Sequence, residues 1–339
     1  MTRSTNTQLG TELPHVPSPV LKRAHGAITS WFAAHARDLP WRRPGTTAWG
    51  VLVSEVMSQQ TPMSRVAPRW EAWMARWPEP ADLAAAPTAE VLKMWDTLGY
   101  PRRALRLQEC AAAVAALPTG RVPDDIDELL ALPGIGTYTA AAVASFAYGQ
   151  RVAVLDVNIR RVLARAFRAL EHPKAALSKL EQAWALELVP RGEDVPGPPA
   201  HVAWNAGLME LGALVCTSRN PDCAACPLAA DCTWLRAGRP AAPAAHKPKT
   251  QAWAGTDRQL RGAIMAVLRQ AGPAPVPVDL FTAPVLRFDP TAMESFDAAV
   301  QKAIMRVREL GNEERTSGLI ADLVSDGLAR VSESGITLP

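Results

Sequence analysis

Four of the five cysteines of this 339-residue chain lie within seventeen residues, and this group restricts the fold more than any other feature of the sequence. Cys216, Cys223, Cys226 and Cys232 are separated by gaps of six, two and five residues. Thiolates grouped this closely usually bind zinc or an iron–sulfur cluster, because soft sulfur donors suit those metals. A disulfide framework is typical of small secreted domains, which this chain does not resemble. Zinc sites usually pair two short loops, so the spacing favours an iron–sulfur cluster and leaves structural zinc as the alternative.

Length and charge allow a two-domain protein that stays in the cytoplasm. A chain of 339 residues can form two hydrophobic cores. No apolar run approaches membrane-spanning length, and the N-terminus lacks the charged-then-apolar pattern of a secretion signal. The net charge of +3 neither requires nor excludes a nucleic-acid partner. One group of arginines predicts either a phosphate-binding surface or a solvated helix face: Arg160, Arg161, Arg165 and Arg168.

The hydrophobic pattern divides the chain into four segments. Residues 1–17 are polar and predict a flexible tail. Residues 18–235 are rich in Ala and Leu, with helical periodicity and breaks at Pro or Gly, which predicts an all-α body. Residues 236–255 are rich in Pro and Ala and predict a linker. Residues 256–339 combine two helices, the second ending near Gly327, with a terminal hairpin, which predicts a small winged-helix-like domain.

A glycine-containing turn interrupts the body at Leu132-Pro133-Gly134-Ile135-Gly136-Thr137. It lies between an apolar helix and an Ala-rich helix, so it predicts a tight hairpin between helices. Its glycines permit positive φ and expose backbone N–H groups at the start of the next helix. Such a turn can bind a phosphate without reading sequence, and an ordinary helix–helix corner is the alternative. A dinucleotide-binding fold does not fit, because no strand precedes the glycines and a third glycine is missing.

Two carboxylates flank this hairpin in the sequence. Asp156 follows an apolar run and precedes a predicted helix, which is the usual position of an N-cap. Glu55 lies beside an apolar stripe at helical spacing, in line with Gln59 one turn later. Because Pro62 disfavours helix at the residue before it, residues 59–61 should present polar groups at a helix end. For Glu55 the alternative is the solvated edge of an amphipathic helix.

Together these features resemble the adenine DNA glycosylases of the MutY family, which belong to the helix-hairpin-helix glycosylases together with endonuclease III. The resemblance covers roughly residues 20–235 and implies a mainly α fold with two helical lobes and an active site in the cleft between them. It also implies a 4Fe–4S cluster bound by the four cysteines of residues 216–232. The motifs that carry it are Ser54-Glu55-Val56-Met57, Gln59-Gln60-Thr61, the Leu-Pro-Gly-Ile-Gly hairpin, Asp156 with Asn158, and the cysteines.

The resemblance implies a catalytic role for four residues. Glu55 would be the general acid that protonates the adenine leaving group, and Asp156 would stabilise the oxocarbenium-like sugar or bond to it transiently. Asn158 would orient the site, and Tyr138 would pack near the sugar. Bifunctional relatives carry a lysine at the position of Tyr138, so the resemblance implies hydrolysis without a lyase step.

The resemblance also implies residues that bind DNA and the flipped adenine. Those expected to contact DNA beside the lesion pair or along its backbone are Gln60, Thr61, Tyr100, Gly134 and Gly136. Those expected to line the adenine pocket are Trp41, Arg42 and Glu210. The substrate would be double-stranded DNA with adenine opposite 8-oxoguanine or guanine, bound by a monomer in the cytoplasm near the nucleoid. A repair or clamp protein is a candidate partner at the linker.

The sequence departs from the family pattern in two respects. Three positions differ from the common residue: Ser58, Pro101 and Val157. Many family members end in a Nudix-like β-rich domain that helps to recognise 8-oxoguanine, and residues 256–339 do not have that pattern. Two alternatives therefore stay open: a glycosylase of the same fold for mismatched thymine or oxidised pyrimidines, and a non-catalytic iron–sulfur DNA-binding protein.

Overall fold

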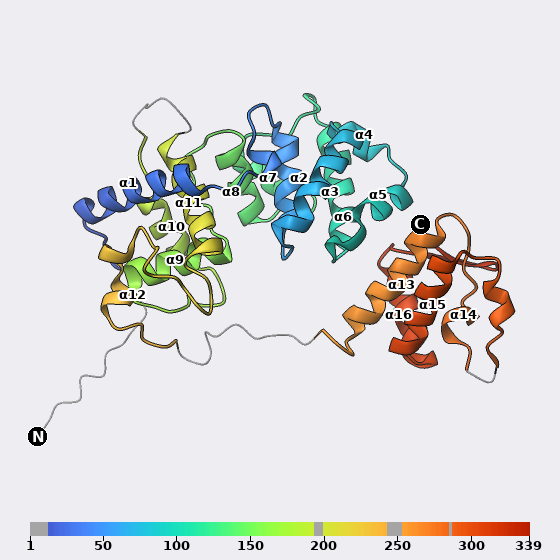
Figure 1. The fold of residues 1–339 in the computed structure, drawn as a ribbon. Coiled ribbons are helices and arrows are strands. Elements are labelled where there is room, and N and C mark those ends of the chain that lie inside the picture. The colour runs from blue at the N-terminus through green and yellow to red at the C-terminus, as the bar shows by residue number, and fades with distance from the viewer. Residues whose placement is uncertain (1–12, 193–198, 243–252, 285–286) are drawn as a thin grey trace, which may run out of the picture. The chain divides into compact units, whose positions relative to one another are not determined.

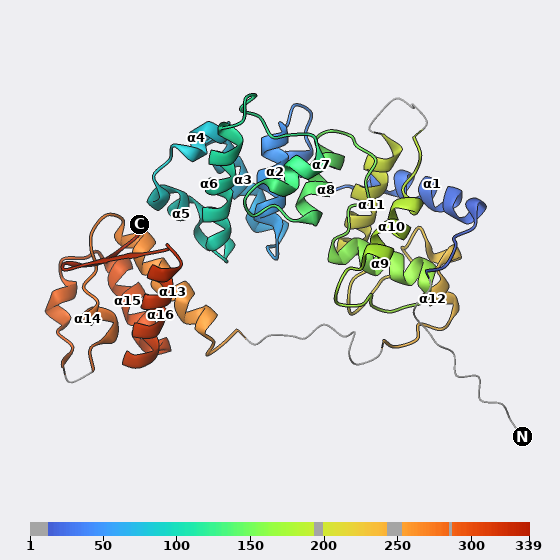
Figure 2. The ribbon, with the colours of Figure 1, turned by 180° about the vertical axis from the view of Figure 1, so that it is seen from behind.

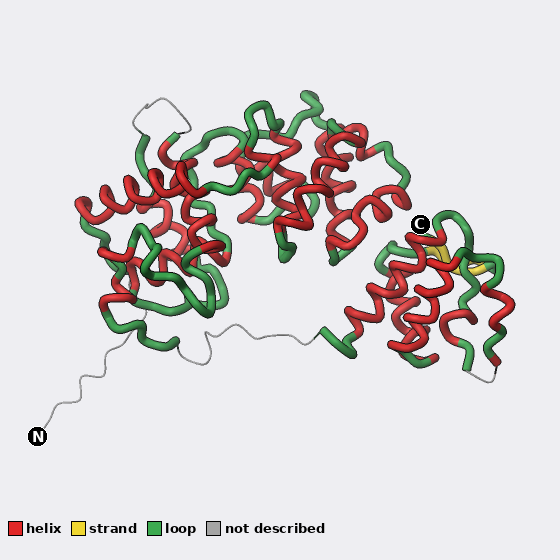
Figure 3. Tube along the Cα trace, viewed as in Figure 1, coloured by secondary structure: helices red, strands yellow, loops and turns green. Residues whose placement is uncertain are grey.

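The computed structural model describes residues 13–192, 199–242, 253–284 and 287–339 (Figure 1). Most of the predicted N-terminal tail and residues 243–252 of the predicted linker lie outside the described residues. Helices dominate the described chain, and its only strands form one hairpin near the C-terminus (Figure 3). None of the helices in these ranges is long and apolar enough to span a membrane. The predicted mainly α fold is confirmed.

The described residues form two compact units, each assembled from segments far apart in the sequence. The first falls within residues 1–51, 124–130 and 135–249. The second falls within residues 52–123, 131–134 and 250–339. The predicted body of residues 18–235 therefore contributes to both units. The chain passes from one to the other inside helix α2 (Ala48–Ser58) and again around the glycine turn.

The first unit is built around two helices that pack side by side, α1 (Ser18–His35) and α11 (Ala200–Leu214) (Figures 1 and 2). Its core contains the buried side chains of Ile28, Trp184 and Trp204. The remaining elements are η1 (Pro40–Arg42), most of α7 (Ile126–Ala131), α8 (Thr137–Phe146), α9 (Val157–Arg168), α10 (Lys179–Leu188), η3 (Ala229–Asp231) and α12 (Thr233–Arg236).

The second unit begins with a helical segment whose core is rich in tryptophan. Trp73 packs edge-on against Trp77 and Trp95, with ring centroids 4.7 and 5.7 Å apart. Aromatic pairs prefer this arrangement because the positive ring edge meets the negative ring face. The elements are most of α2, α3 (Met63–Arg76), α4 (Pro80–Ala84), α5 (Thr88–Trp95), η2 (Asp96–Leu98) and α6 (Arg102–Ala115).

The C-terminal part of the second unit has the predicted order of helices followed by a hairpin. Its longer helices are α13 (Asp257–Ala271), α15 (Ala298–Leu310) and α16 (Glu313–Ser325), and each has a side-chain N-cap. Shorter elements are α14 (Asp279–Thr282) and η6 (Pro290–Met293). Strands β1 (Arg330–Ser332) and β2 (Gly335–Thr337) pair antiparallel. Ile336 of β2 also forms a bridge with Val276, as a third strand does in a winged helix.

Candidate functional site

Glu55 lies in the last turn of α2 and is only 8% exposed. The helix is apolar on nearly every side, and a helix of that kind is buried. Trp49, Leu52 and Val53 are at most 2% exposed. The alternative of a solvated helix edge is therefore wrong, and Glu55 is a carboxyl group shielded from water in the second unit.

Arg103, which the sequence did not single out, holds the chain that follows α2. Its Nη1 donates to the carbonyl oxygens of Val56 at 2.9 Å and Gln59 at 2.5 Å. Its Nη2 donates to the carbonyl oxygen of Gly99 at 3.1 Å and to Thr61 Oγ1 at 3.3 Å. Burial lowers the pKa of Arg103 to about 10, so the side chain is a cation at neutral pH. Arg103 therefore ties the segment 59–61 to the segment 98–100.

Two of the predicted DNA-binding residues have a strained backbone in these two segments. Gln60 has φ of 55° and Tyr100 has φ of 49°, a region that side-chain-bearing residues rarely occupy. Tyr100 is 43% exposed, whereas Thr61 is buried and donates to the carbonyl oxygen of Leu98 at 3.0 Å. Such strain persists only where the surroundings hold it, and the hydrogen bonds of Arg103 to the neighbouring carbonyl groups provide that support.

The glycine turn joins α7 to α8, as predicted. Gly134 has φ of 76°, a backbone conformation that residues with a side chain rarely adopt. A Cβ atom at this position would also lie 3.0 Å from Cβ of Arg106, so steric crowding disfavours a side chain as well. Gly136 precedes α8 in an extended conformation, and a Cβ atom there would meet nothing within 4 Å. The first N–H groups of α8 have no partner within the helix, as at any helix N-terminus, and such groups can bind an anion.

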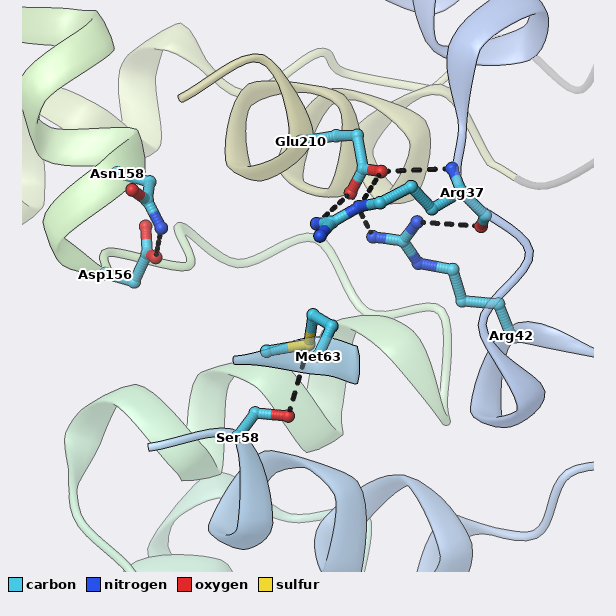
Figure 4. A network of polar contacts seen from close by, with 7 residues as sticks. All are labelled: Arg37, Arg42, Ser58, Met63, Asp156, Asn158 and Glu210. Carbon is cyan, nitrogen blue, oxygen red and sulfur yellow. Dashed lines mark hydrogen bonds and ion pairs between the residues drawn. The ribbon is translucent and has the colours of Figure 1, made fainter. Parts of the chain in front are cut away.

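Asp156 is the N-cap of α9, as predicted. One carboxylate oxygen accepts the backbone N–H of Ile159 at 2.7 Å, and the other accepts Nδ2 of Asn158 at 2.8 Å (Figure 4). Burial raises the pKa of Asp156, while these hydrogen bonds and the charge of Arg161 oppose that rise. A carboxylate oxygen can accept more than one hydrogen bond, so capping leaves acceptor capacity for a substrate.

Arg161 connects this capped carboxylate to the cysteine loop. Its Nη2 donates to Oδ1 of Asn158 at 2.9 Å and to the carbonyl oxygen of Gly212 at 2.6 Å. Its Nε donates to the carbonyl oxygen of Cys216 at 2.8 Å. Gly212 is required here, because a Cβ atom on it would lie 2.7 Å from Cβ of Asn158. The amide of Asn158 is therefore held between Asp156 and Arg161.

Three of the four arginines predicted to form a phosphate-binding surface or a solvated face of α9 are buried instead. Arg160, Arg161 and Arg165 are 8%, 8% and 1% exposed. Arg160 forms a two-point ion pair with Glu181, with both N···O distances 2.8 Å. Neither a phosphate-binding surface nor a solvated face describes these residues. They bind carboxylate and carbonyl oxygens inside the first unit.

Glu210 of α11 is fully buried and is bound by two arginines (Figure 4). Its Oε1 accepts the backbone N–H of Arg37 at 3.0 Å and Nε of Arg37 at 2.6 Å. Its Oε2 accepts Nη2 of Arg37 at 3.0 Å and Nη2 of Arg42 at 2.9 Å. Burial alone would raise the pKa of Glu210, but these hydrogen bonds and the charge of Arg42 lower it to about 2. Trp41 and Arg42 both belong to η1, so the structure brings the three predicted pocket residues into one region of the first unit.

The four cysteines line one cavity, together with Arg165 and Trp234. None of them forms a disulfide. Nη1 of Arg165 lies 3.4 Å from Sγ of Cys216, and burial raises the pKa of Cys226 to about 12, an effect that the neighbouring thiols reinforce. Four cysteines around one cavity match the donor set of a 4Fe–4S cube, in which each iron takes one cysteine. Within the described ranges, no three His, Cys, Asp or Glu side chains are close enough to hold a single metal ion.

The structure distributes the predicted residues between the two units. The first contains Trp41, Arg42, Gly136, Tyr138, Asp156, Asn158, Glu210 and the four cysteines, and the second contains Glu55, Gln60, Thr61, Tyr100 and Gly134. Tyr138 is partly buried against the core of the first unit. Sequence reasoning missed Arg37 and Arg103. The only sequence signal for Arg37 was its position four residues before Trp41. The only sequence signal for Arg103 was its position shortly after Tyr100.

Comparison with known proteins agrees with this arrangement. Residues 53–186 match the HhH-GPD superfamily of base excision DNA repair proteins. An adenine DNA glycosylase of Mycolicibacterium smegmatis is 50% identical over 244 residues, which are 72% of this chain and 80% of the relative. The human adenine DNA glycosylase is 40% identical over 215 residues, which are 61% of this chain and 38% of the relative.

Solved structures show the same fold. A thermostable thymine-DNA glycosylase has a TM-score of 0.57 and 26% identity, covering 65% of this chain and 98% of its own. A non-covalent endonuclease III–DNA complex has a TM-score of 0.55 and 21% identity, covering 66% of this chain and 99% of its own. With a relative of 50% identity matched over 80% of its length, the chain belongs to the adenine DNA glycosylase family.

Proposed function

We propose that the protein excises adenine from double-stranded DNA in which it is mispaired with 8-oxoguanine or guanine. The observation that carries this proposal is the pair of unlike carboxyl groups. Glu55 is buried in an apolar helix, whereas Asp156 is held by Ile159 and Asn158 at a helix N-terminus. Carboxyl groups in unlike environments take the roles of proton donor and charge stabiliser in glycosidic cleavage. A DNA-binding protein without catalysis would need neither.

The proposed reaction is hydrolysis of the N-glycosidic bond. The adenine nucleotide leaves the base stack, Glu55 donates a proton to the departing base, and the C1′–N9 bond breaks. The carboxylate of Asp156 stabilises the positive charge that develops on the sugar until water attacks C1′. Asn158 keeps that carboxylate oriented through its 2.8 Å hydrogen bond. Tyr138 has no amine to form a Schiff base, so the reaction stops at the abasic site.

Substrate recognition is proposed for the other predicted residues. Gln60 and Tyr100 contact the lesion pair, and Gly134 with Gly136 bind the backbone phosphate. The side chain of Thr61 is buried and bound to Leu98 and Arg103, so its role is to hold the segment that carries Gln60. Trp41 and Arg42 line the adenine pocket. Glu210 is fully buried with its oxygens bound to arginine, so its role is to position Arg42 and Arg37, whose side chains are 25% and 35% exposed. A hydrogen-bonding pocket of this kind discriminates strongly between bases.

We also propose that Cys216, Cys223, Cys226 and Cys232 hold a 4Fe–4S cluster. When bound, the cluster supplies a redox-active group and a cross-link that holds residues 216–232 together. Arg165 donates toward the sulfur of Cys216, as hydrogen bonds to cluster sulfurs commonly do. The proposed excision chemistry uses Glu55 and Asp156.

The test is single-turnover base release from duplexes containing 8-oxoguanine–adenine, guanine–adenine, guanine–thymine and an oxidised pyrimidine. We expect release of adenine alone. Glu55→Gln and Asp156→Asn should keep DNA binding and lose roughly 10²–10⁴-fold in rate, the usual contribution of a positioned proton donor or acceptor. Glu187→Gln, which changes an exposed carboxylate of α10, is the matched control. Near-normal excision by either site variant would reassign the chemistry, and release of thymine or pyrimidine alone would replace adenine as the substrate.

A further inference from the structure

Two ion pairs inside the second unit join its C-terminal helices to the helices that precede and follow Tyr100. Nε of Arg269 in α13 lies 3.8 Å from Oδ1 of Asp96. Nη1 of Arg102 in α6 lies 3.2 Å from Oδ1 of Asp326, just after α16. The Arg269 side chain is only 14% exposed, so this contact is largely shielded from water. These pairs hold α13 and the residue after α16 against the segments on either side of Tyr100.

A third contact reaches Tyr100 itself. Nη1 of Arg258 in the first turn of α13 donates to the hydroxyl oxygen of Tyr100 at 2.9 Å. The same guanidinium lies 5.0 Å from the ring centre of Trp253, which is 54% exposed. Arg103 lies 5.5 Å from the ring centre of Tyr100. Two exposed aromatic rings and Arg258 therefore form one patch, which combines the stacking surfaces and positive charge that bind nucleic acid.

The other elements of the C-terminal domain are less suited to DNA. On α15, Arg308 donates to two backbone carbonyl oxygens of the same domain, at 3.2 and 2.9 Å. Arg306 pairs with Glu309 at 2.7 Å. Helix α16, which precedes the hairpin, begins with the exposed acids Glu313 and Glu314. Those charges would repel phosphate, whereas Arg258 lies beside two exposed aromatic rings.

We propose that Arg258 is a DNA-binding residue that the C-terminal domain adds to the surface of Tyr100, where it neutralises one backbone phosphate beside the lesion pair. Trp253 supports the guanidinium through its ring face. The inference rests on the proposed function, because only there is Tyr100 assigned to the lesion pair. It gives the C-terminal domain a part in DNA binding without a Nudix-like fold.

The test is equilibrium binding of the full-length protein, measured by fluorescence anisotropy at several salt concentrations. The probe is an 8-oxoguanine duplex whose opposing adenine nucleotide carries a 2′-fluorine, so that the base stays attached, alongside an undamaged duplex. Arg258→Ala should weaken binding to both duplexes by the same factor, on the order of tenfold, because a phosphate contact does not read sequence. The slope of log affinity against log salt should fall by about 1.

The controls separate this role from domain docking. Arg306→Ala removes one charge elsewhere in the same domain and should change neither affinity nor slope. Asp326→Asn weakens the pairs of this residue with Arg102 and Arg261 and should affect binding less than Arg258→Ala. Arg258→Lys should retain the salt slope. An Arg258→Ala protein with unchanged or tighter binding would overturn the inference, as would a loss confined to the 8-oxoguanine duplex. If Arg258 supports binding as stated but the wild-type protein releases no adenine from an unmodified substrate, the proposed function fails, and the phosphate contact of Arg258 stands without its place beside a lesion pair.

Discussion

Replacing Glu210 by Gln should destabilise the protein far more than loss of an ordinary surface charge. The carboxylate accepts four hydrogen bonds from Arg37 and Arg42 and is fully buried. Glutamine is nearly the same size but has one acceptor oxygen and no charge. Both arginines would therefore keep their positive charge with a weaker partner. Breaking one side of a buried pair is costly because it leaves uncompensated charge behind.

The size of the effect follows from the pKa of Glu210, which is lowered from 4.5 to about 2. At about 1.4 kcal/mol per pKa unit, this corresponds to roughly 3 kcal/mol of stability at neutral pH. Because the folded-state pKa is the lower one, the stabilisation is present above pH 4.5 and is lost as the pH falls toward about 2. Glutamine does not titrate, so the stability difference between wild type and Glu210→Gln should shrink over that interval.

Urea unfolding at pH 7, followed by tryptophan fluorescence, measures the difference. We expect the free energy of unfolding to fall by about 3 kcal/mol for Glu210→Gln. Glu90→Gln removes an ion pair with Arg76 in which the Glu90 side chain is 47% exposed and the Arg76 side chain is 60% exposed. This control should lower the free energy of unfolding by less than about 1 kcal/mol. If the two variants lost similar amounts, the buried arginine–glutamate cluster would stabilise the fold no more than a surface ion pair does.

Three further outcomes are expected in the first unit. Gly212→Ala should slow excision several-fold by displacing Asn158, because the new Cβ would lie 2.7 Å from it. Gly26→Ala, in open space on α1, is the control and should be neutral or stabilising. Arg161→Gln should lower the rate at saturating protein with little change in DNA affinity, and an effect on affinity alone would refute its positioning role. Anaerobically purified protein should contain about four irons per chain, and the Cys226→Ser variant should contain fewer. One zinc ion per chain without iron would contradict the proposed 4Fe–4S cluster.

Features that depend on neighbouring residues were predictable from the sequence. Helix α13 and the final hairpin appear where periodicity and turn residues placed them, and Asp156 caps α9 because a carboxylate can reach the N–H three residues later. The glycine turn also appears as predicted, since Gly134 has the positive φ that glycine tolerates. Each of these depends on interactions within a few residues.

The burial of charged residues was not predictable in the same way. Arg161 and Arg165 were consistent with an exposed helix face, yet they bind the backbone of residues 212–218, about fifty positions later in the chain. Glu210 lies more than 160 residues from the arginines that bind it. No local pattern indicates that such partners will meet.

The helical character, the motifs and the family of this protein can be read from the sequence, because each is encoded in residue identity and short spacing. Which charged groups are buried, and which groups bind them, becomes visible only in the folded chain. The tertiary structure showed that Arg103 binds two strained segments and that Arg161 links Asn158 to the cysteine loop. A buried charge is stable only when partners compensate its lost hydration. Those partners are backbone carbonyl oxygens and carboxylates from distant segments, which come together only when the whole chain is folded.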